Sequence, residues 1–187
     1  MSPGGCHAGV LFTAPSMGST EAERYFALSI AGARARLYIT NAYFIPGDDF
    51  RRLLVEAAER GVDVRVLTPG ANTDKPATWY AGRHHYEELL AAGVRIWEYR
   101  PTMVHAKSLV ADGTWAAVGT LNFDNRSIAL NDEVTLLCHG AELGSHLEDR
   151  FLLDLELADE LELDRFRRRG AWERAKERLA VGLARVL

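Results

Sequence analysis

A histidine and a lysine two residues apart are the side chains of this sequence best suited to chemistry. His105 and Lys107 open an alternating apolar run, Val104–Ala111, which ends at Asp112 and Gly113. Because side chains two apart on a strand point the same way, the spacing places His105 and Lys107 on one face, about 6.5 Å apart along the strand. Asp112 is an odd number of residues from both, so its carboxylate is predicted to face away from His105.

These residue types suit reactions at a phosphate group. A histidine acts as a nucleophile or as an acid and base near neutral pH, and a lysine places a positive charge beside the non-bridging oxygens. Further along the chain, Asn122 offers amide donors, and Glu133 is a candidate for orienting and stabilising the imidazole. A histidine and a lysine on a strand are more often an ordinary surface pair, so the motif gains its weight from the residues that follow it.

The longer pattern resembles the signature of the phospholipase D superfamily. It reads H-A-K-x4-D from His105, then G-T-x-N-x-D-x-R-S from Gly119, then N-D-E ending at Glu133. The chain is most similar to the C-terminal half of bacterial cardiolipin synthases. Thr120 stands where serine is more usual, and the first loop reads Asn-Ala-Tyr-Phe instead of Thr-Pro-Tyr-Phe, but neither change removes a reacting group. The larger departure is that H-x-K-x4-D occurs once here and twice in cardiolipin synthases.

The resemblance implies a phosphatidyltransferase or phosphodiesterase that works through a phosphohistidine intermediate, with no metal or other cofactor. It implies a catalytic set of four residues, namely His105, Lys107, Asp112 and Glu133. It implies that three residues bind the phosphate, namely Lys107, Thr120 and Asn122. The expected substrate is a phospholipid, phosphatidylglycerol first. The second motif is expected from a homodimer, joined across the strand edge that carries the motif, or from an N-terminal half that this sequence does not contain.

Two other functions stay open. A single-motif nuclease acting as a dimer would use the same residues, but 22 basic and 26 acidic residues give a net charge of −4, which argues against a nucleic acid partner. A half-enzyme that serves only as a binding or regulatory module is the third reading. The joint presence of His105, Lys107, Asn122 and Glu133 argues against it.

The elements that must position these residues alternate along the chain. Strand-like and helix-like segments follow one another from Arg36 to Tyr99, which predicts an α/β fold with a mixed, largely parallel sheet flanked by helices on both faces. Asp112–Gly113 adds an antiparallel hairpin. The polar loops after Thr40, Leu67 and Gly119 meet His105 at one edge only if the motif strand runs opposite to the strands before them.

The length of 187 residues, with 48% hydrophobic and 26% charged residues, is ordinary for one domain with a hydrophobic core. We expect a single domain over residues 1–187, with a flexible start at residues 1–8 and a C-terminal helical segment at residues 158–187. No apolar run reaches the roughly 18 residues of a membrane-spanning helix. The expected location is therefore the bacterial cytoplasm or the periphery of the inner membrane.

Three further features receive ordinary interpretations. The basic cluster Arg165–Arg169, with Lys176 and Arg178, is compatible with peripheral contact to anionic lipid headgroups, but we favour a solvated helix start with interspersed glutamates. The pair His84–His85 is interpreted as ordinary helix residues, because no cysteine or carboxylate at metal spacing accompanies it. Cys138 ends an apolar run and is expected to be a buried free thiol.

Overall fold

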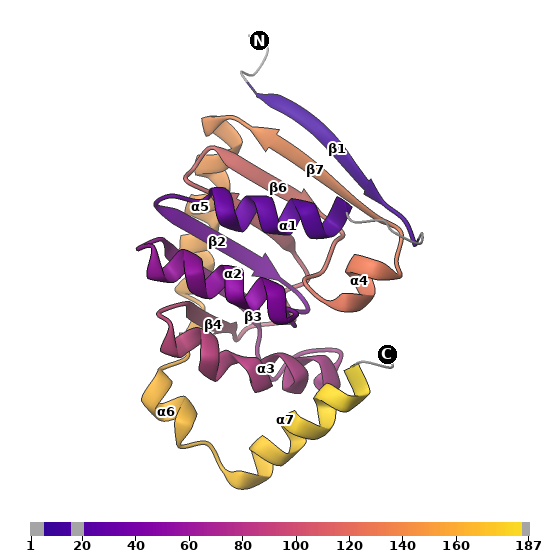
Figure 1. Cartoon of the computed structure of the whole chain (residues 1–187). Coiled ribbons are helices and arrows are strands. Elements are labelled where there is room, and N and C mark those ends of the chain that lie inside the picture. Colours follow the sequence, from indigo (N-terminus) through magenta and orange to yellow (C-terminus); the bar gives the residue numbers. More distant parts are fainter. Residues whose placement is uncertain (1–5, 16–20, 185–187) are drawn as a thin grey trace.

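The computed structural model describes residues 6–15 and 21–184, which build one eight-stranded sheet with helices on both faces (Figure 1). The strands are β1 (His7–Thr13), β2 (Arg36–Asn41), β3 (Asp63–Pro69), β4 (Arg95–Tyr99), β5 (Lys107–Ala111), β6 (Trp115–Gly119), β7 (Glu133–His139) and β8 (Ala158–Glu160). The helices are α1 (Glu21–Gly32), α2 (Asp48–Glu59), α3 (Pro76–Ala91), α4 (Asn125–Ala129), α5 (Ala141–Leu155), α6 (Leu163–Arg167) and α7 (Ala171–Ala184).

The sheet is mixed, in the order β1-β7-β6-β5-β2-β3-β4-β8. Among the described residues only β2–β3 and β3–β4 pair in parallel, and the other five pairs are antiparallel. The predicted mixed sheet is therefore confirmed, but the prediction overstated the share of parallel pairs. The parallel pairs β2–β3 and β3–β4 are joined through helices. β5, β6 and β7 form consecutive antiparallel pairs, and the edge strands β1 and β8 pair antiparallel with β7 and β4.

The motif strand β5 runs opposite to its neighbours. This direction is required if the polar loops and His105 are to lie at one edge of the sheet. β5 is antiparallel to both β2 and β6, so its first residue lies at the same edge of the sheet as the last residues of those strands. Because β5 lies inside the sheet, it offers no free strand edge for pairing with a second copy. The predicted dimer contact across the motif strand therefore cannot form by strand addition, and any such contact must use the strand ends or a face of the sheet.

Helices cover both faces of the sheet and enclose two cores. The larger core lies under α1, α2 and α3 and includes Phe26, Leu54, Leu89 and Phe123. The smaller core joins α5 to the opposite face through Phe151, whose ring stacks on that of Tyr38 at 4.9 Å between centroids. Figure 1 shows α1, α2 and α3 in front of the sheet and α5 behind it.

Residues with positive φ end two helices and close the hairpin. Gly61 and Gly93, with φ of 88° and 95°, follow α2 and α3 and allow the chain to turn into β3 and β4. Asp112 and Gly113, with φ of 54° and 65°, join β5 to β6. Positive φ at both central residues is typical of two-residue hairpin turns, so the hairpin prediction is confirmed.

The two ends of the described chain differ from expectation. β1 already begins at His7, inside the predicted flexible start, and pairs with β7 over seven residues. The C-terminal segment contains α6 and α7 but also the short strand β8.

Cys138 is buried as predicted, but it is not a free thiol, since it forms a disulfide with Cys6 across 6.2 Å between Cα atoms. No helix in residues 6–15 and 21–184 has the length and apolar character needed to cross a bilayer.

Candidate active site

His105 lies in the loop before β5, and its side chain is exposed. The strand starts at Lys107, so the alternation expected from Val104 onwards does not reach the histidine. Lys107 is only 9% exposed, and its ammonium donates a hydrogen bond to the backbone oxygen of His105 at 2.7 Å. Burial lowers the pKa of Lys107, and nearby carboxylates, first that of Glu133, oppose this shift. The lysine therefore holds the histidine loop through this hydrogen bond. Its positive charge is only weakly screened by solvent, because the side chain is buried.

The ring of Tyr43 connects this pair to the loop after β3. It meets the His105 ring edge-on at 5.9 Å between centroids, and the ammonium groups of Lys107 and Lys75 lie 6.0 and 4.9 Å from its centroid. The Tyr43 hydroxyl donates to Asp74, 2.9 Å from each carboxylate oxygen. Burial and this hydrogen bond raise the pKa of Tyr43, so the hydroxyl stays protonated. Tyr43 is buried, and it also lines a cavity beside Asn122.

Asn122 brings the motif loop to the same edge of the sheet. Its Nδ2 donates to Ser127 Oγ at 3.0 Å, while its buried Oδ1 has no hydrogen-bond partner among the described residues. Turning the amide about its last torsion would let the Ser127 hydroxyl donate to Oδ1 and place Nδ2 in the unpartnered position. A phosphate oxygen would then complete the hydrogen bonds of this side chain, which fits the predicted phosphate contact.

A buried asparagine that the sequence did not single out locks the two loops together. Asn41, the last residue of β2, accepts hydrogen bonds through Oδ1 from the backbone N–H of Phe123 at 3.0 Å and of Tyr43 at 3.2 Å. Asp124 then caps α4 by accepting from the backbone N–H of Ser127 at 2.8 Å. This cap braces the motif loop.

Glu133 and Thr120 form a second polar pair at the strand ends. Glu133 is 8% exposed and accepts from the hydroxyl of Thr120 and from Asn131 Nδ2, the latter at 3.2 Å. Thr120 had been expected to bind phosphate; in this structure its hydroxyl donates to Glu133. The charge of Glu133 partly offsets the lowering of the Lys107 pKa that burial causes. Among the described residues Glu133 thus hydrogen-bonds to Thr120 and Asn131 and acts on Lys107 through its charge, and no hydrogen bond joins it to the imidazole of His105.

Asp112 lies in the turn after β5, at the end of the strand opposite to His105. Its carboxylate accepts hydrogen bonds from three successive backbone N–H groups, those of Arg34, Ala35 and Arg36, at 2.9, 2.8 and 2.9 Å. Burial opposes ionisation, but these donors outweigh it and hold the pKa of Asp112 below its ordinary value. The geometry gives this motif residue a structural position, although the resemblance grouped it with the catalytic set.

A cavity of about 600 Å³ opens beside Asn122. The loop after β2, the first turns of α2 and α3, and α4 form its walls, and α7 closes one side through Val181. Lys75 and His85 also line this cavity. Burial and the neighbouring Arg51 lower the pKa of His85 to about 4, which leaves its ring neutral near pH 7.

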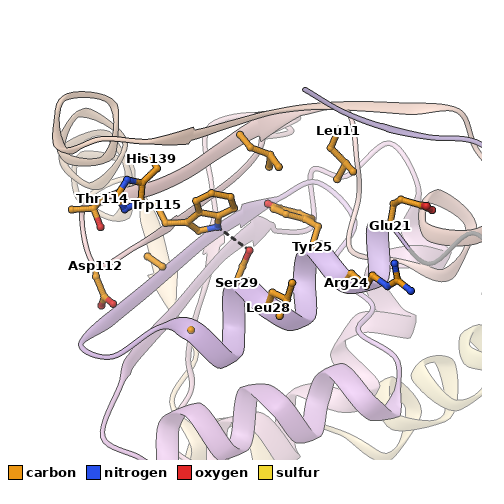
Figure 2. Close-up of a pocket in the computed structure, with 13 residues that line it drawn as sticks. Leu11, Glu21, Arg24, Tyr25, Leu28, Ser29, Asp112, Thr114, Trp115 and His139 are labelled. Carbon is orange, nitrogen blue, oxygen red and sulfur yellow. Dashed lines mark hydrogen bonds between the residues drawn. The ribbon is translucent and has the colours of Figure 1, made fainter. Parts of the chain in front are cut away.

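A second cavity, of about 490 Å³, lies between α1 and the strands β1, β6 and β7. Figure 2 shows Trp115 donating to Ser29 across it, a hydrogen bond of 2.9 Å, with Tyr25 and Leu11 on its walls. Asp112 lines its far end, but His105, Lys107, Asn122 and Glu133 do not line it. Of these four residues, Asn122 lines the cavity of about 600 Å³, whereas His105, Lys107 and Glu133 line neither of the two cavities.

This fold, with a histidine and lysine at the start of a central strand and an asparagine loop beside them, defines a phospholipase D-like domain. Residues 28–155 match the family model described as "Cardiolipin synthase, PLD-like domain", and the chain belongs to that family.

The relatives are named as cardiolipin synthases. The chain is 41% identical over 153 residues to cardiolipin synthase 2 of Bacillus anthracis, covering 82% of this chain and 29% of the relative. It is 36% identical over 178 residues to the probable cardiolipin synthase YwiE of Bacillus subtilis, covering 95% of this chain and 35% of the relative. The chain thus spans about a third of the length of these relatives.

Solved structures share the fold at low sequence identity. The phosphatidylserine synthase of Haemophilus influenzae matches with a TM-score of 0.74 at 15% identity, over 99% of this chain and 46% of that one. The phospholipase D family member Nuc of Salmonella typhimurium matches with a TM-score of 0.69 at 18% identity, over 84% of this chain and 99% of that one.

Proposed function

We propose that this chain is one half of a cardiolipin synthase-like phosphatidyltransferase or phosphodiesterase, in which His105 acts at a phospholipid phosphate. The observation that carries the proposal is the placement at one edge of the sheet of an exposed imidazole, a buried lysine that holds the histidine loop, and a buried amide lacking one partner. The names of the relatives supply the substrate class, and phosphatidylglycerol is the first candidate.

The reaction proceeds in two steps. One imidazole nitrogen attacks phosphorus, forming a P–N bond while the bond to the leaving oxygen breaks, and a second imidazole gives that oxygen its proton. A hydroxyl then attacks the phosphohistidine, its proton passes to the second imidazole, and the P–N bond breaks. The hydroxyl of glycerol or of another phosphatidylglycerol gives transfer, and water gives hydrolysis. By resemblance to two-motif members, His105 is the acid and base; in a homodimer each copy serves either role.

The neighbouring residues stabilise the charge that develops on phosphorus-bound oxygens. Lys107 is already partly desolvated, so its attraction for a phosphate oxygen is stronger than that of a lysine in water. Asn122 adds one amide donor after the turn described above. Tyr43, fixed by Asp74, limits the positions of the His105 ring from one side.

The second imidazole must come from outside the described site, because in-line displacement places the entering and leaving atoms on opposite sides of phosphorus. An exposed apolar surface lies next to the motif loops on the sheet. We call it the apolar face; its members are Val10, Phe12, Val118, Val134 and Leu136. These residues are neighbours across β1, β7 and β6 in the register, and Val134 directly follows Glu133. The apolar face is where we place the partner that supplies the second motif.

The test is incubation with phosphatidylglycerol in the presence of EDTA, with separation of the lipid products. We expect cardiolipin and glycerol, unaffected by the chelator, because the reacting groups proposed are an imidazole, an ammonium and an amide. His105→Ala should abolish turnover, and His84→Ala, on the surface of α3, should not. Complete loss in EDTA restored by a divalent ion would contradict the phosphohistidine mechanism.

The same preparation distinguishes the other functions. Degradation of DNA or RNA without action on phospholipid would favour the single-motif nuclease. Absence of turnover on both substrates at every protein concentration, with intact phosphate binding, would favour the binding module.

A further inference from the structure

The C-terminal helix α7 is fixed against α3 by a buried charge cluster. Glu177, 1% exposed, accepts two hydrogen bonds of 3.0 Å from Arg169 and lies 3.6 Å from Arg83. Arg83 also pairs with Glu98 of β4 at 2.5 Å. A buried carboxylate of this kind tolerates few other arrangements of its partners. The cluster therefore sets which side of α7 faces the protein and which faces outward.

The outward side of α7 carries large apolar side chains. Trp172 is 73% exposed and Leu179 is 70% exposed. Seven residues separate them, close to two helical turns, so they form one ridge along the helix. Lys176 lies between them and reaches across the Trp172 ring at 5.8 Å. Nothing in the described chain covers this ridge, although tryptophan is costly to leave in water.

Basic side chains flank the ridge. Residues 164–178 contain seven basic and three acidic residues, in a chain whose net charge is −4. Three of the arginines, Arg165, Arg168 and Arg178, are exposed and have no ion-pair partner within the described ranges. Figure 1 shows α6 and α7 projecting below the sheet, with α7 directed back towards α4. The positive charge is thus concentrated on one projecting element.

The same helix reaches the candidate active site. Val181, two residues after Leu179, lines the cavity beside Asn122. Two residues turn a helix by about 200°, so the ridge lies on the side of α7 opposite the one that closes the cavity.

We propose that the outward face of α7 is a docking surface for an anionic lipid bilayer. Trp172 and Leu179 enter the boundary between headgroups and acyl chains, and Arg165, Arg168 and Arg178 lie against the lipid phosphates. A ridge of tryptophan and leucine flanked by arginines fits such an interface better than it fits a protein partner of unspecified charge. This inference rests on the proposed function, in which the substrate is a phospholipid. The solvated interpretation of the basic cluster is replaced, because the sequence did not show Trp172 facing outward.

Vesicle co-sedimentation tests the proposal without turnover. The probes are vesicles of phosphatidylcholine alone and of phosphatidylcholine mixed with phosphatidylglycerol. We expect wild-type protein to bind the mixed vesicles, with binding that weakens as salt screens the arginines. The double variant Trp172→Ser and Leu179→Ser should lose at least about tenfold in affinity, since the two side chains together remove more than the 1.4 kcal/mol of a tenfold change.

The matched control is the double variant Leu152→Ser and Leu153→Ser on α5, where the side chains are 41% and 53% exposed. This control should bind like wild type. Circular dichroism confirms that both double variants are folded, as expected for changes outside the charge cluster. Substituting Arg165, Arg168 and Arg178 by glutamine should remove the preference for phosphatidylglycerol over phosphatidylcholine.

Equal binding by wild type and the α7 double variant would overturn the proposal, as would equal loss in the α5 control. If the α7 variant instead binds vesicles normally but changes the oligomeric state of the chain, the ridge is a protein contact and the proposal is wrong. Vesicle binding through α7 by a protein that does not turn over phosphatidylglycerol supports this inference and contradicts the proposed function, so the two failures are distinguishable.

Discussion

Asp112 connects the hairpin after the motif strand to the start of β2. Its carboxylate accepts from three backbone N–H groups, and a hydrogen bond to a charged group contributes roughly 1.5–3 kcal/mol. With partial exposure taken into account, we predict that Asp112→Ala lowers the free energy of unfolding by about 2 kcal/mol and the melting temperature by roughly 4–8 °C. His105→Ala, at an exposed position, should melt like wild type. Identical melting temperatures for both variants would contradict this assignment.

The same carboxylate should make stability depend on pH. Because the pKa of Asp112 in the fold lies below its ordinary value near 4, its contribution is fully present above about pH 4 and is lost as the pH falls through the folded value. The difference in melting temperature between wild type and Asp112→Ala should therefore shrink in acid. The raised pKa of Asp124 acts in the opposite direction, but it is common to both proteins and cancels in the difference. A difference that stays constant from neutral pH to acid would refute the linkage.

At the scale of residues, the sequence predicted which loops reach one edge of the sheet but not the hydrogen bonds within them. His105, Lys107 and Asn122 come to one edge of the sheet because strand directions follow from the order of elements. The bond from Lys107 to the backbone of His105, and that from Thr120 to Glu133, depend on loop conformations that no periodic pattern encodes. Asn41 gave only a weak signal, as a polar residue ending an apolar strand.

At the scale of elements, the approach of β6 to β7 decides where the motif loop starts. A Cβ at Gly119 would lie 2.3 Å from the backbone oxygen of Val134 and 2.6 Å from Thr135 Cα. Gly119→Ala must therefore separate the two strands and displace Thr120 from Glu133. We predict a loss of roughly 1–3 kcal/mol in the free energy of unfolding, as for other overpacked sites, together with reduced activity.

Denaturant unfolding measures this effect, and Gly9→Ala is the matched control. Gly9 also lies in a strand of the sheet, but a Cβ there meets nothing within 4 Å. An unchanged unfolding midpoint for Gly119→Ala would show that the strands can separate at no cost.

The elements from Arg36 to Tyr99 could be predicted because each is long enough to show its period and is closed by a glycine or a turn. β8 and α4 could not, since three and five residues carry no recognisable period. Strand order could not be predicted either: β8 joins β4 by tertiary contacts such as the ion pair of Arg95 with Glu160 at 2.8 Å. The share of parallel pairs was overestimated because the sequence does not encode which strands become neighbours.

At the scale of the whole molecule, two surfaces remain uncovered, and they differ in chemistry. The apolar face exposes Phe12 at 75% and Val10 at 58%, beside the motif loops and on the sheet. The ridge of α7 combines apolar and basic groups on a helix. The first suits a second domain of the same fold, and the second suits a bilayer. The two surfaces lie on different elements, so a partner on the apolar face leaves the ridge of α7 free for lipid.

The stoichiometry of the active unit follows from the geometry of displacement. One imidazole cannot attack phosphorus and protonate the opposite leaving oxygen in the same step, and His105 is the candidate that lies beside both Lys107 and Tyr43. If the active unit is a two-fold dimer through the apolar face, the same patch serves on both subunits and each subunit contributes one His105. We predict that activity per molecule falls on dilution, together with the dimer fraction from light scattering.

Variants of the apolar face make this prediction specific. The double variant Phe12→Ser and Leu136→Ser should reduce dimerisation and activity together, because it replaces apolar area that only the partner covers. Leu28→Ser on α1, a position 72% exposed, should change neither. A monomer with undiminished activity per molecule at every dilution would refute the requirement for a second imidazole. A monomer without activity would instead indicate that the second motif comes from an N-terminal half, and adding that half in trans should then restore turnover through the same apolar face.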